Sequence, residues 1–154
     1  MQDQTADIEW RDGVIPVSTM FDDPYFSLDN GMEETRHVFL GGNDLPARFV
    51  DGFHVAELGF GTGLNLLALH LANPGLALRF TSFEAFPLTA PQISRALDHF
   101  PSALAVAGPF LQAWSKGETR FTLGPVQVQV VIGDARATLP PWDGRADAWF
   151  LDGF

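Results

Sequence analysis

The sequence predicts an α/β fold with a mostly parallel sheet, and three observations carry this prediction. From residue 53 onwards, short apolar stretches alternate with stretches of helical character. A glycine-rich segment separates the first expected strand from the first expected helix, and an acidic residue stands where several strands end. Alternation of this kind is typical of crossover connections between parallel strands. We therefore expect a Rossmann-like sheet.

The first 50 residues are expected to form an N-terminal extension with little regular structure. Residues 14–18 read as a short strand, and Pro16 favours an edge position because proline cannot donate to a strand ladder. Residues 31–40 read as a helix that Gly41 and Gly42 end.

Residues 51–154 carry the clearer pattern and are expected to form one partial domain. The expected strands are residues 53–58, 78–83, 121–123, 126–132 and 146–151, and the expected helices are residues 64–72, 89–100 and 102–114. Thr89 is a plausible helix cap, and Pro91 suits a first turn. Open α/β sheets usually continue with further crossovers, so a chain that stops after its last strand predicts a sheet that is incomplete at the C-terminus.

The glycine-rich segment Gly59-Phe60-Gly61-Thr62-Gly63 is the first candidate site. Glycines allow a tight turn and a close approach of ligand to backbone, beside the free N–H groups of a helix N-terminus. The spacing differs from the G-x-G-x-x-G of pyrophosphate sites, and Glu57 stands two residues before it. An acid suits a cation, so the segment predicts a site for S-adenosylmethionine, which carries an ammonium and a sulfonium but no phosphate. The alternative is a glycine turn without a ligand.

Three further acids, Glu84, Asp134 and Asp152, stand at the ends of later strands. Ligands of open α/β sheets bind beyond the carboxyl ends of the strands. Glu84 could accept hydrogen bonds from both hydroxyls of a ribose, and Asp134 could accept one from an adenine amino group. Asp152 would lie beside the sulfonium, where it could orient an amine or take its proton. Each acid alone could instead be a solvated or turn-capping residue, but four acids at four strand ends favour a site.

Composition excludes several classes of protein. The chain has no cysteine, which excludes disulfides, thiolate zinc sites and a cysteine nucleophile. The four histidines share no metal-ligand spacing, so we expect no metal; they are His37, His54, His70 and His99. No apolar run reaches the roughly 18 residues of a membrane helix, so we expect a cytoplasmic protein without membrane contact. The net charge of −10, with Lys116 as the sole lysine, argues against a nucleic-acid partner.

Several phrases of the sequence together resemble one family. The most specific are residues 21–27, FDDPYFS, and residues 147–154, DAWFLDGF. Further matching phrases stand in order at residues 16–18, 34–40, 42–48, 57–65, 82–84, 86–88 and 133–135. From about residue 9 to its end, the chain resembles the methyltransferase domain of the bacterial enzyme that completes 5-methylaminomethyl-2-thiouridine at the wobble position of tRNA.

This resemblance implies a class I S-adenosylmethionine-dependent methyltransferase fold and a primary amine of tRNA as the methyl acceptor. Glu57, Gly59, Gly61 and Gly63 would line the methionine end of the donor, and Phe60 and Asn65 of the same stretch would also contact it. Glu84 would hold the ribose, Asp134 and Ala135 would flank the adenine, and Asp152 would sit beside the acceptor amine. Residues 1–50 would fold over the donor pocket.

The resemblance also sets expectations about missing parts. Family members continue beyond the Leu-Asp-Gly-Phe phrase, and that continuation would supply more of the pocket and a positive surface for tRNA. Some members are fused to a flavin-dependent oxidoreductase, which this chain lacks, so we expect no flavin. Two alternatives stay open: a methyltransferase for a small molecule or protein, and a non-catalytic nucleotide-binding module. An exposed sheet edge would also permit a homodimer.

Overall fold

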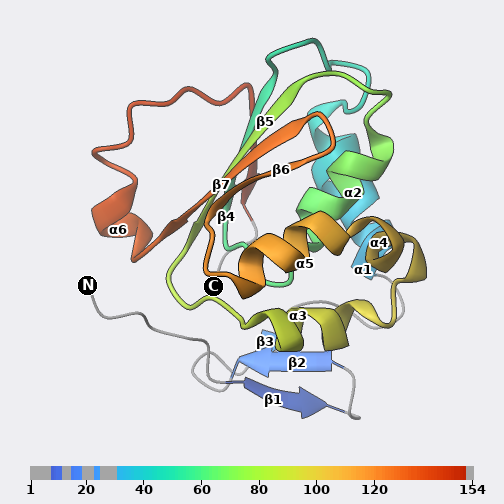
Figure 1. The fold of residues 1–154 in the computed structure, drawn as a ribbon. Helices are drawn as coiled ribbons and strands as arrows, with labels where there is room; N and C mark the ends of the chain where they lie inside the picture. Colours follow the sequence, from blue (N-terminus) through green and yellow to red (C-terminus); the bar gives the residue numbers. More distant parts are fainter. Residues whose placement is uncertain (1–7, 12–14, 19–22, 25–30, 152–154) are drawn as a thin grey trace.

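The computed structural model describes residues 8–11, 15–18, 23–24 and 31–151, which form two sheets with helices around the larger one (Figure 1). The larger sheet contains β4 (His54–Leu58), β5 (Leu78–Glu84), β6 (Arg120–Leu123), β7 (Val126–Ile132) and β8 (Ala148–Leu151). Their order is β6-β7-β5-β4-β8, and every pairing is parallel except that of β6 with β7. The predicted mostly parallel α/β sheet is confirmed, with all five of its strands.

Strand order places a topological switch at β4. From β4 the chain crosses to β5 and then to β7 on one side, and later returns to β8 on the other side of β4. Open α/β sheets bind their ligands outside the carboxyl ends of the strands at such a switch. The segment that follows β4, the glycine loop, therefore occupies the position where a ligand is expected.

Five helices connect these strands: α2 (Leu64–Ala72), α3 (Ala90–Leu97), α4 (Pro101–Val106), α5 (Gly108–Ser115) and the short α6 (Ala135–Thr138). The Thr89 hydroxyl caps α3 by accepting from the Gln92 N–H, and the Gln92 side chain accepts from the Thr89 N–H, as the sequence predicted for Thr89. The prediction of one helix over 102–114 is wrong. Pro109 lacks the N–H that a continuous helix needs, so the chain forms two helices that meet at Ala107.

The core lies on one face of the larger sheet. Val55, Phe80 and Phe150 of three neighbouring strands are at most 1% exposed and pack with the leucines of α2. Figure 1 shows α2, α3, α4 and α5 gathered on this side, with α6 apart from them. Because helices cover this face, α2 is apolar nearly all round, with six consecutive buried residues from Leu64 to Leu69.

The other face carries a second aromatic group. Trp142, from the segment after α6, lies edge-on to Phe83 and to Trp149, with ring centroids 5.4 and 5.9 Å away. The ring of His54 donates to or accepts from the Thr81 hydroxyl at 2.8 Å, and burial lowers the pKa of His54. This histidine is a packed strand residue, as the lack of metal-ligand spacing predicted.

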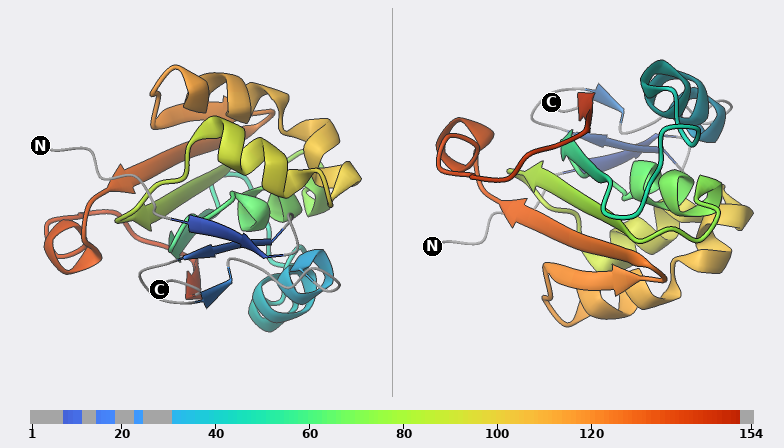
Figure 2. Two further views of the ribbon diagram at one scale, coloured as in Figure 1. Left: turned by 90° about the horizontal axis from the view of Figure 1, so that it is seen from below. Right: turned by 90° about the horizontal axis from the view of Figure 1, so that it is seen from above.

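The N-terminal part forms a small antiparallel sheet of β1 (Ile8–Arg11), β2 (Ile15–Ser18) and β3 (Asp23–Pro24). The prediction that Pro16 marks an edge strand is wrong, because β2 is central. β3 pairs only with Val17 and Ser18 of β2, so Pro16 has no partner in β3, and its missing N–H costs no hydrogen bond on that side. Figure 2 shows this sheet from below and from above, and Figure 1 shows it beneath α3, at the end of the molecule towards which β5 runs.

A helical segment joins the two sheets. It begins as α1 (Gly31–Glu34), continues as a π-helical stretch (Thr35–Leu40) and ends in a 3-10 turn (Gly41–Asn43). The stretch of residues 31–40 agrees with the predicted helix, and Gly41 is its C-cap, but the two glycines continue into the 3-10 turn. The end comes at Asp44, whose φ of 55° is left-handed and stops further helical bonding.

Candidate functional site

The glycine loop turns sharply between β4 and α2. Gly59, Gly61 and Gly63 have φ values of 87°, 57° and 77°, which residues with a Cβ rarely adopt. The Gly59 N–H donates to the Phe83 carbonyl at 2.8 Å, and the Gly63 N–H donates to the Phe60 carbonyl at 3.0 Å. The loop is thereby fastened to the end of β5 and closed on itself, so its conformation requires the glycines that the sequence places there.

Aromatic side chains hold the loop from the core side. A Cβ on Gly63 would lie 2.8 Å from Cε2 of Phe110, so a larger residue does not fit without movement. Phe60 is only 3% exposed and packs edge-on against Phe110, with ring centroids 5.5 Å apart. The Phe60 ring thus belongs to the core, and only the backbone of Phe60 is available to a ligand outside the loop.

Glu84, the last residue of β5, connects the glycine loop to the segment after β5 and to the end of β7. It is 7% exposed, and its Oε1 accepts from the Gly61 N–H at 2.9 Å, while its Oε2 accepts from the Phe86 N–H at 3.2 Å. Burial raises the pKa of the Glu84 carboxyl, although hydrogen bonds from backbone N–H groups, those of Gly61 and Phe86 before those of Ala85 and Phe60, oppose the shift. The Glu84 carbonyl accepts from the Gly133 N–H at 2.9 Å, which joins the end of β7 to the same position.

Glu57 lies beneath the loop and is 1% exposed. Its Oε2 accepts from the Asn65 side-chain amide and its Oε1 accepts from the Ser82 hydroxyl, each at 2.8 Å. These bonds connect β4 to the first turn of α2 and to β5. Glu57 and Asn65 are therefore partners of each other inside the fold, beneath the backbone that a ligand would contact.

Asp134 and Ala135 follow the end of β7 and begin the short helix α6, where Asp134 is exposed to solvent. The Asp134 carboxylate caps α6 by accepting from the Arg136 N–H at 2.9 Å, and it forms an exposed ion pair with the Arg136 guanidinium at 2.6 Å. Those contacts with Arg136 lower the pKa of Asp134 to about 2. The Asp134 carboxylate is therefore ionised at neutral pH and exposed to solvent, whereas the Glu84 carboxyl is buried.

The structure brings most of the predicted site residues to one edge of the sheet. Gly61 and Glu84 touch directly, Glu57 with Asn65 lies beneath them, and Asp134 follows one residue after Gly133, which bonds to the Glu84 backbone. Asp152 lies outside the described residues, as does most of the 21–27 phrase. Ser82 was not predicted as a site residue: it is one of several polar residues in β5, and only the structure shows that its hydroxyl donates to Glu57.

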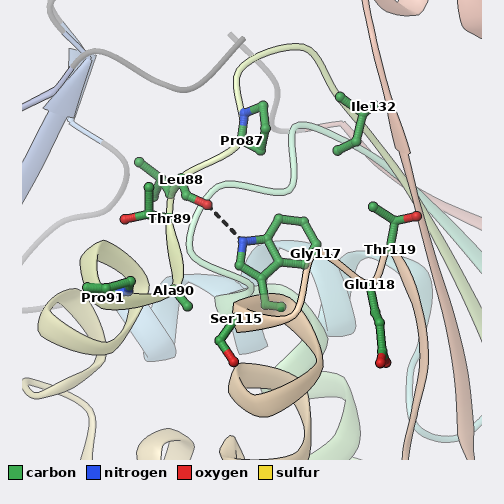
Figure 3. A pocket seen from close by; sticks show the side chains of 11 residues that line it. Pro87, Leu88, Thr89, Ala90, Pro91, Ser115, Gly117, Glu118, Thr119 and Ile132 are labelled. Atoms are coloured by element: carbon green, nitrogen blue, oxygen red, sulfur yellow. Dashed lines mark hydrogen bonds between the residues drawn. The ribbon is translucent and has the colours of Figure 1, made fainter. Parts of the chain in front are cut away.

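A pocket of about 540 Å³ lies beside this edge (Figure 3). Its walls are residues 87–91 before and at the start of α3, residues 114–115 and 117–119 around the end of α5, and Ile132 at the end of β7. The lining is mostly apolar, and Glu118 is the acid among these wall residues. This pocket cannot be predicted from the sequence, because its walls come from three segments far apart in the chain.

The described part of the chain has neither a metal-type cluster of side chains nor a membrane-spanning helix. It contains no group of three or more His, Cys, Asp or Glu side chains that could hold a metal ion. None of its helices is long and apolar enough to cross a membrane.

Comparison with known proteins identifies the family. Residues 103–154 match the model of an S-adenosyl-L-methionine-dependent methyltransferase family. A tRNA 5-methylaminomethyl-2-thiouridine biosynthesis bifunctional protein MnmC from Leptospira borgpetersenii is 42% identical over 161 residues, covering 96% of this chain and 25% of the relative. Proteins of the same name from Aeromonas hydrophila and Caulobacter sp. are each 41% identical, over 97% and 100% of this chain. The chain belongs to this methyltransferase family.

The relatives are much longer than the matching region. The chain spans about a quarter of the length of the MnmC proteins from Leptospira and Aeromonas. The crystal structure of MNMC2 from Aquifex aeolicus superposes with a TM-score of 0.62 and 24% sequence identity, over 99% of this chain and 50% of that one. That likeness confirms the fold, a Rossmann-like α/β sheet.

Proposed function

We propose that this chain binds S-adenosylmethionine at the glycine loop and Glu84, and that it is part of an enzyme that methylates the primary amine of 5-aminomethyl-2-thiouridine in tRNA. One observation carries the proposal: a buried carboxylate, Glu84, accepts from the glycine loop at the carboxyl edge of the sheet, beside the switch at β4. The names of the MnmC relatives supply the class of acceptor.

The residues present fit this donor by their chemistry. A carboxylate accepts hydrogen bonds at about four positions, so the ribose hydroxyls would donate to Glu84 beside or in place of the backbone N–H groups that now bond to it. Because Gly59 and Gly61 have no side chains, a ligand could approach the backbone of the loop closely at these two positions. Asp134, ionised and exposed, and the neighbouring Ala135 would meet the adenine. Glu57 and Asn65 would act from below, by fixing the loop whose backbone lines the methionine end.

When bound, the donor supplies a methyl group on a sulfonium, which is already a good leaving group. The chain then has mainly to align the amine with that methyl carbon and to keep the amine unprotonated. We assign the second task to Asp152, which follows β8 by one residue and would accept a proton from the amine.

We also propose that the N-terminal residues 1–50 cover the donor pocket of the domain formed by residues 51–154. The contact that supports this is between Trp10 of β1 and Arg95 of α3, with the guanidinium carbon 4.0 Å from the ring centroid. Ile8 and Trp10 also pack against the core. The small sheet is therefore attached to the helix that follows the Glu84 segment.

Calorimetric titration with S-adenosylmethionine, with NAD as the control ligand, tests the donor site. We expect binding of the methyl donor alone, and its loss in Glu84→Ala. Transfer of a labelled methyl group to tRNA isolated from cells that leave the 5-aminomethyl group unmethylated tests the acceptor. Binding of the donor without transfer to tRNA would contradict the proposed activity and favour a non-catalytic binding module.

A second candidate acceptor is a small molecule or a protein. The observation in its favour is charge: the first 51 residues contain eleven acids and three arginines, and the whole chain carries −10. tRNA binding usually needs basic residues and falls steeply with salt. Labelled transfer to small amines or peptides, with none to tRNA, would establish this alternative.

The cellular context is part of the same proposal. An enzyme of this kind would act in the cytoplasm, without flavin or metal in this part of the chain. β8 lies at one edge of the larger sheet among the described strands, which would allow two copies to pair there. Sedimentation analysis would reveal such a dimer.

A further inference from the structure

Trp114 joins the two loops that surround Glu84. It stands in the last turn of α5, and its indole Nε1–H donates to the Leu88 carbonyl at 2.8 Å, the dashed line in Figure 3. Leu88 lies four residues after Glu84, in the segment between β5 and α3. The bond therefore holds that segment against a helix 26 positions later in the chain.

The same indole lies against the glycine loop. It stacks on the Phe60 ring, with centroids 5.2 Å apart and an angle of 27° between the planes. Phe110 fills the angle between them, 5.5 Å from Phe60 and 5.9 Å from Trp114. Phe110 also packs closely against Gly63. If the Trp114 indole moved, Phe60 and Phe110 would lose their packing partner, and the glycine loop would lose its contact with the core at these two rings.

We infer that Trp114 is a positioning residue for the donor site. The Glu84 carboxylate accepts from Gly61, next to Phe60, and from Phe86, two residues before Leu88. One indole thus sets the position of both backbone donors around the acid. This inference rests on the proposed function, because it takes the Glu84 site to be the donor site. A site held in its binding geometry before the ligand arrives loses less free energy to ordering.

A merely structural role would look different. Trp114 is only partly buried and forms a wall of the 540 Å³ pocket, so its ring is not enclosed on every side. Its polar bond goes to a loop carbonyl instead of a side chain of the core. The replacement Trp114→Phe keeps an aromatic ring in this place and removes the N–H, so it tests the tie between the loops more than the packing.

Trp142→Phe is the matched control. Trp142 is also a partly buried indole in an aromatic group, but it packs on the other face of the sheet. We expect both variants to lower Tm to a similar extent. Trp114→Phe should weaken S-adenosylmethionine binding about five- to tenfold, the effect of losing one net hydrogen bond, whereas Trp142→Phe should change it less than about twofold. Equal donor affinity in the two variants would overturn the inference.

A second measurement needs no ligand and separates this inference from the proposed function. Amide hydrogen exchange in the unliganded protein reports the N–H groups of Gly61 and Phe86 directly. We expect faster exchange at both amides in Trp114→Phe, with the middle of α2 unchanged. Unchanged exchange at both amides would refute the role of Trp114. Faster exchange in a protein that does not bind the methyl donor would refute the proposed function and leave the role of Trp114 in place.

Discussion

Glu57 and Glu84 lie near the carboxyl ends of neighbouring strands and are both almost fully buried, yet they have opposite surroundings. Glu57 accepts from two side chains, Asn65 and Ser82, which stand on α2 and β5. Glu84 accepts from two backbone N–H groups that belong to loops. The first acid joins regular elements to each other, and the second joins the loops that a ligand would touch. Burial alone therefore does not distinguish the two acids, but their hydrogen-bond donors do: side chains of regular elements for Glu57 and loop N–H groups for Glu84.

The largest expected effect is that of Glu57→Ala on folding. Its removal leaves the Asn65 amide and the Ser82 hydroxyl buried without their acceptor. We expect the free energy of unfolding to fall by roughly 2–4 kcal/mol, as measured by urea denaturation. A loss below about 1 kcal/mol would show that water or another group replaces the carboxylate, and the comparison between the two acids would fail.

Gly63→Ala tests the loop between the two acids, and Gly117→Ala is its control. The two glycines have nearly equal φ values, 77° and 76°, but only Gly63 has atoms within 4 Å of an added Cβ. We expect Gly117→Ala to cost about 1 kcal/mol through backbone strain. Gly63→Ala should cost about 1–3 kcal/mol more, because Phe110 must move. Equal losses in urea denaturation would mean that the aromatic group yields without cost.

Glu84→Gln should separate binding from stability. The glutamine side chain can still accept from the Gly61 N–H through its carbonyl oxygen, but its NH₂ group then faces the Phe86 N–H and offers fewer acceptors to a ribose. We expect donor affinity, measured by calorimetry, to fall about tenfold or more. The free energy of unfolding at pH 7 should stay within about 1 kcal/mol of the parent value, since the variant no longer buries a charge.

The pH dependence sharpens this test. The pKa of Glu84 is raised in the folded state. The carboxyl therefore stabilises the fold at pH values below its ordinary pKa of 4.5, and this stabilisation is lost as the pH rises through the higher pKa of the folded state. The parent chain should therefore lose stability relative to Glu84→Gln as pH rises from about 4.5 towards neutrality. A gain with rising pH would mean that the backbone donors outweigh the effect of burial.

The sequence predicted the larger sheet because its strands are short apolar runs between clear helix signals. It failed at the break near Ala107, since apolar periodicity continues across Gly108-Pro109 while the hydrogen bonding does not. It also placed Pro16 at an edge, because a single strand does not reveal how far its neighbours extend.

The sequence places the candidate acids near the ends of strands, but it does not reveal their contacts. Acids at strand ends are visible in the sequence, since parallel strands end at one edge. The sequence cannot show that Ser82 bonds to Glu57, or that Trp114 reaches Leu88, because both contacts depend on packing between distant segments. The roles of Asp152 and of the donor-binding residues stay predictions.

The smallest expected effect concerns Asp134, the exposed counterpart of the two buried acids. Arg136→Ala removes the contacts that lower the pKa of Asp134 to about 2, so that pKa should return towards 3.8 in a carbon-detected NMR titration. Tm should change by less than about 1 °C, because an exposed ion pair is screened by solvent and salt. The backbone bond from residue 136 to the Asp134 side chain can survive the change, which preserves the cap of α6. A fall of several degrees in Tm would instead show that this end of β7 depends on its ion pair, and Asp134 would then resemble Glu57 more than a ligand-facing residue.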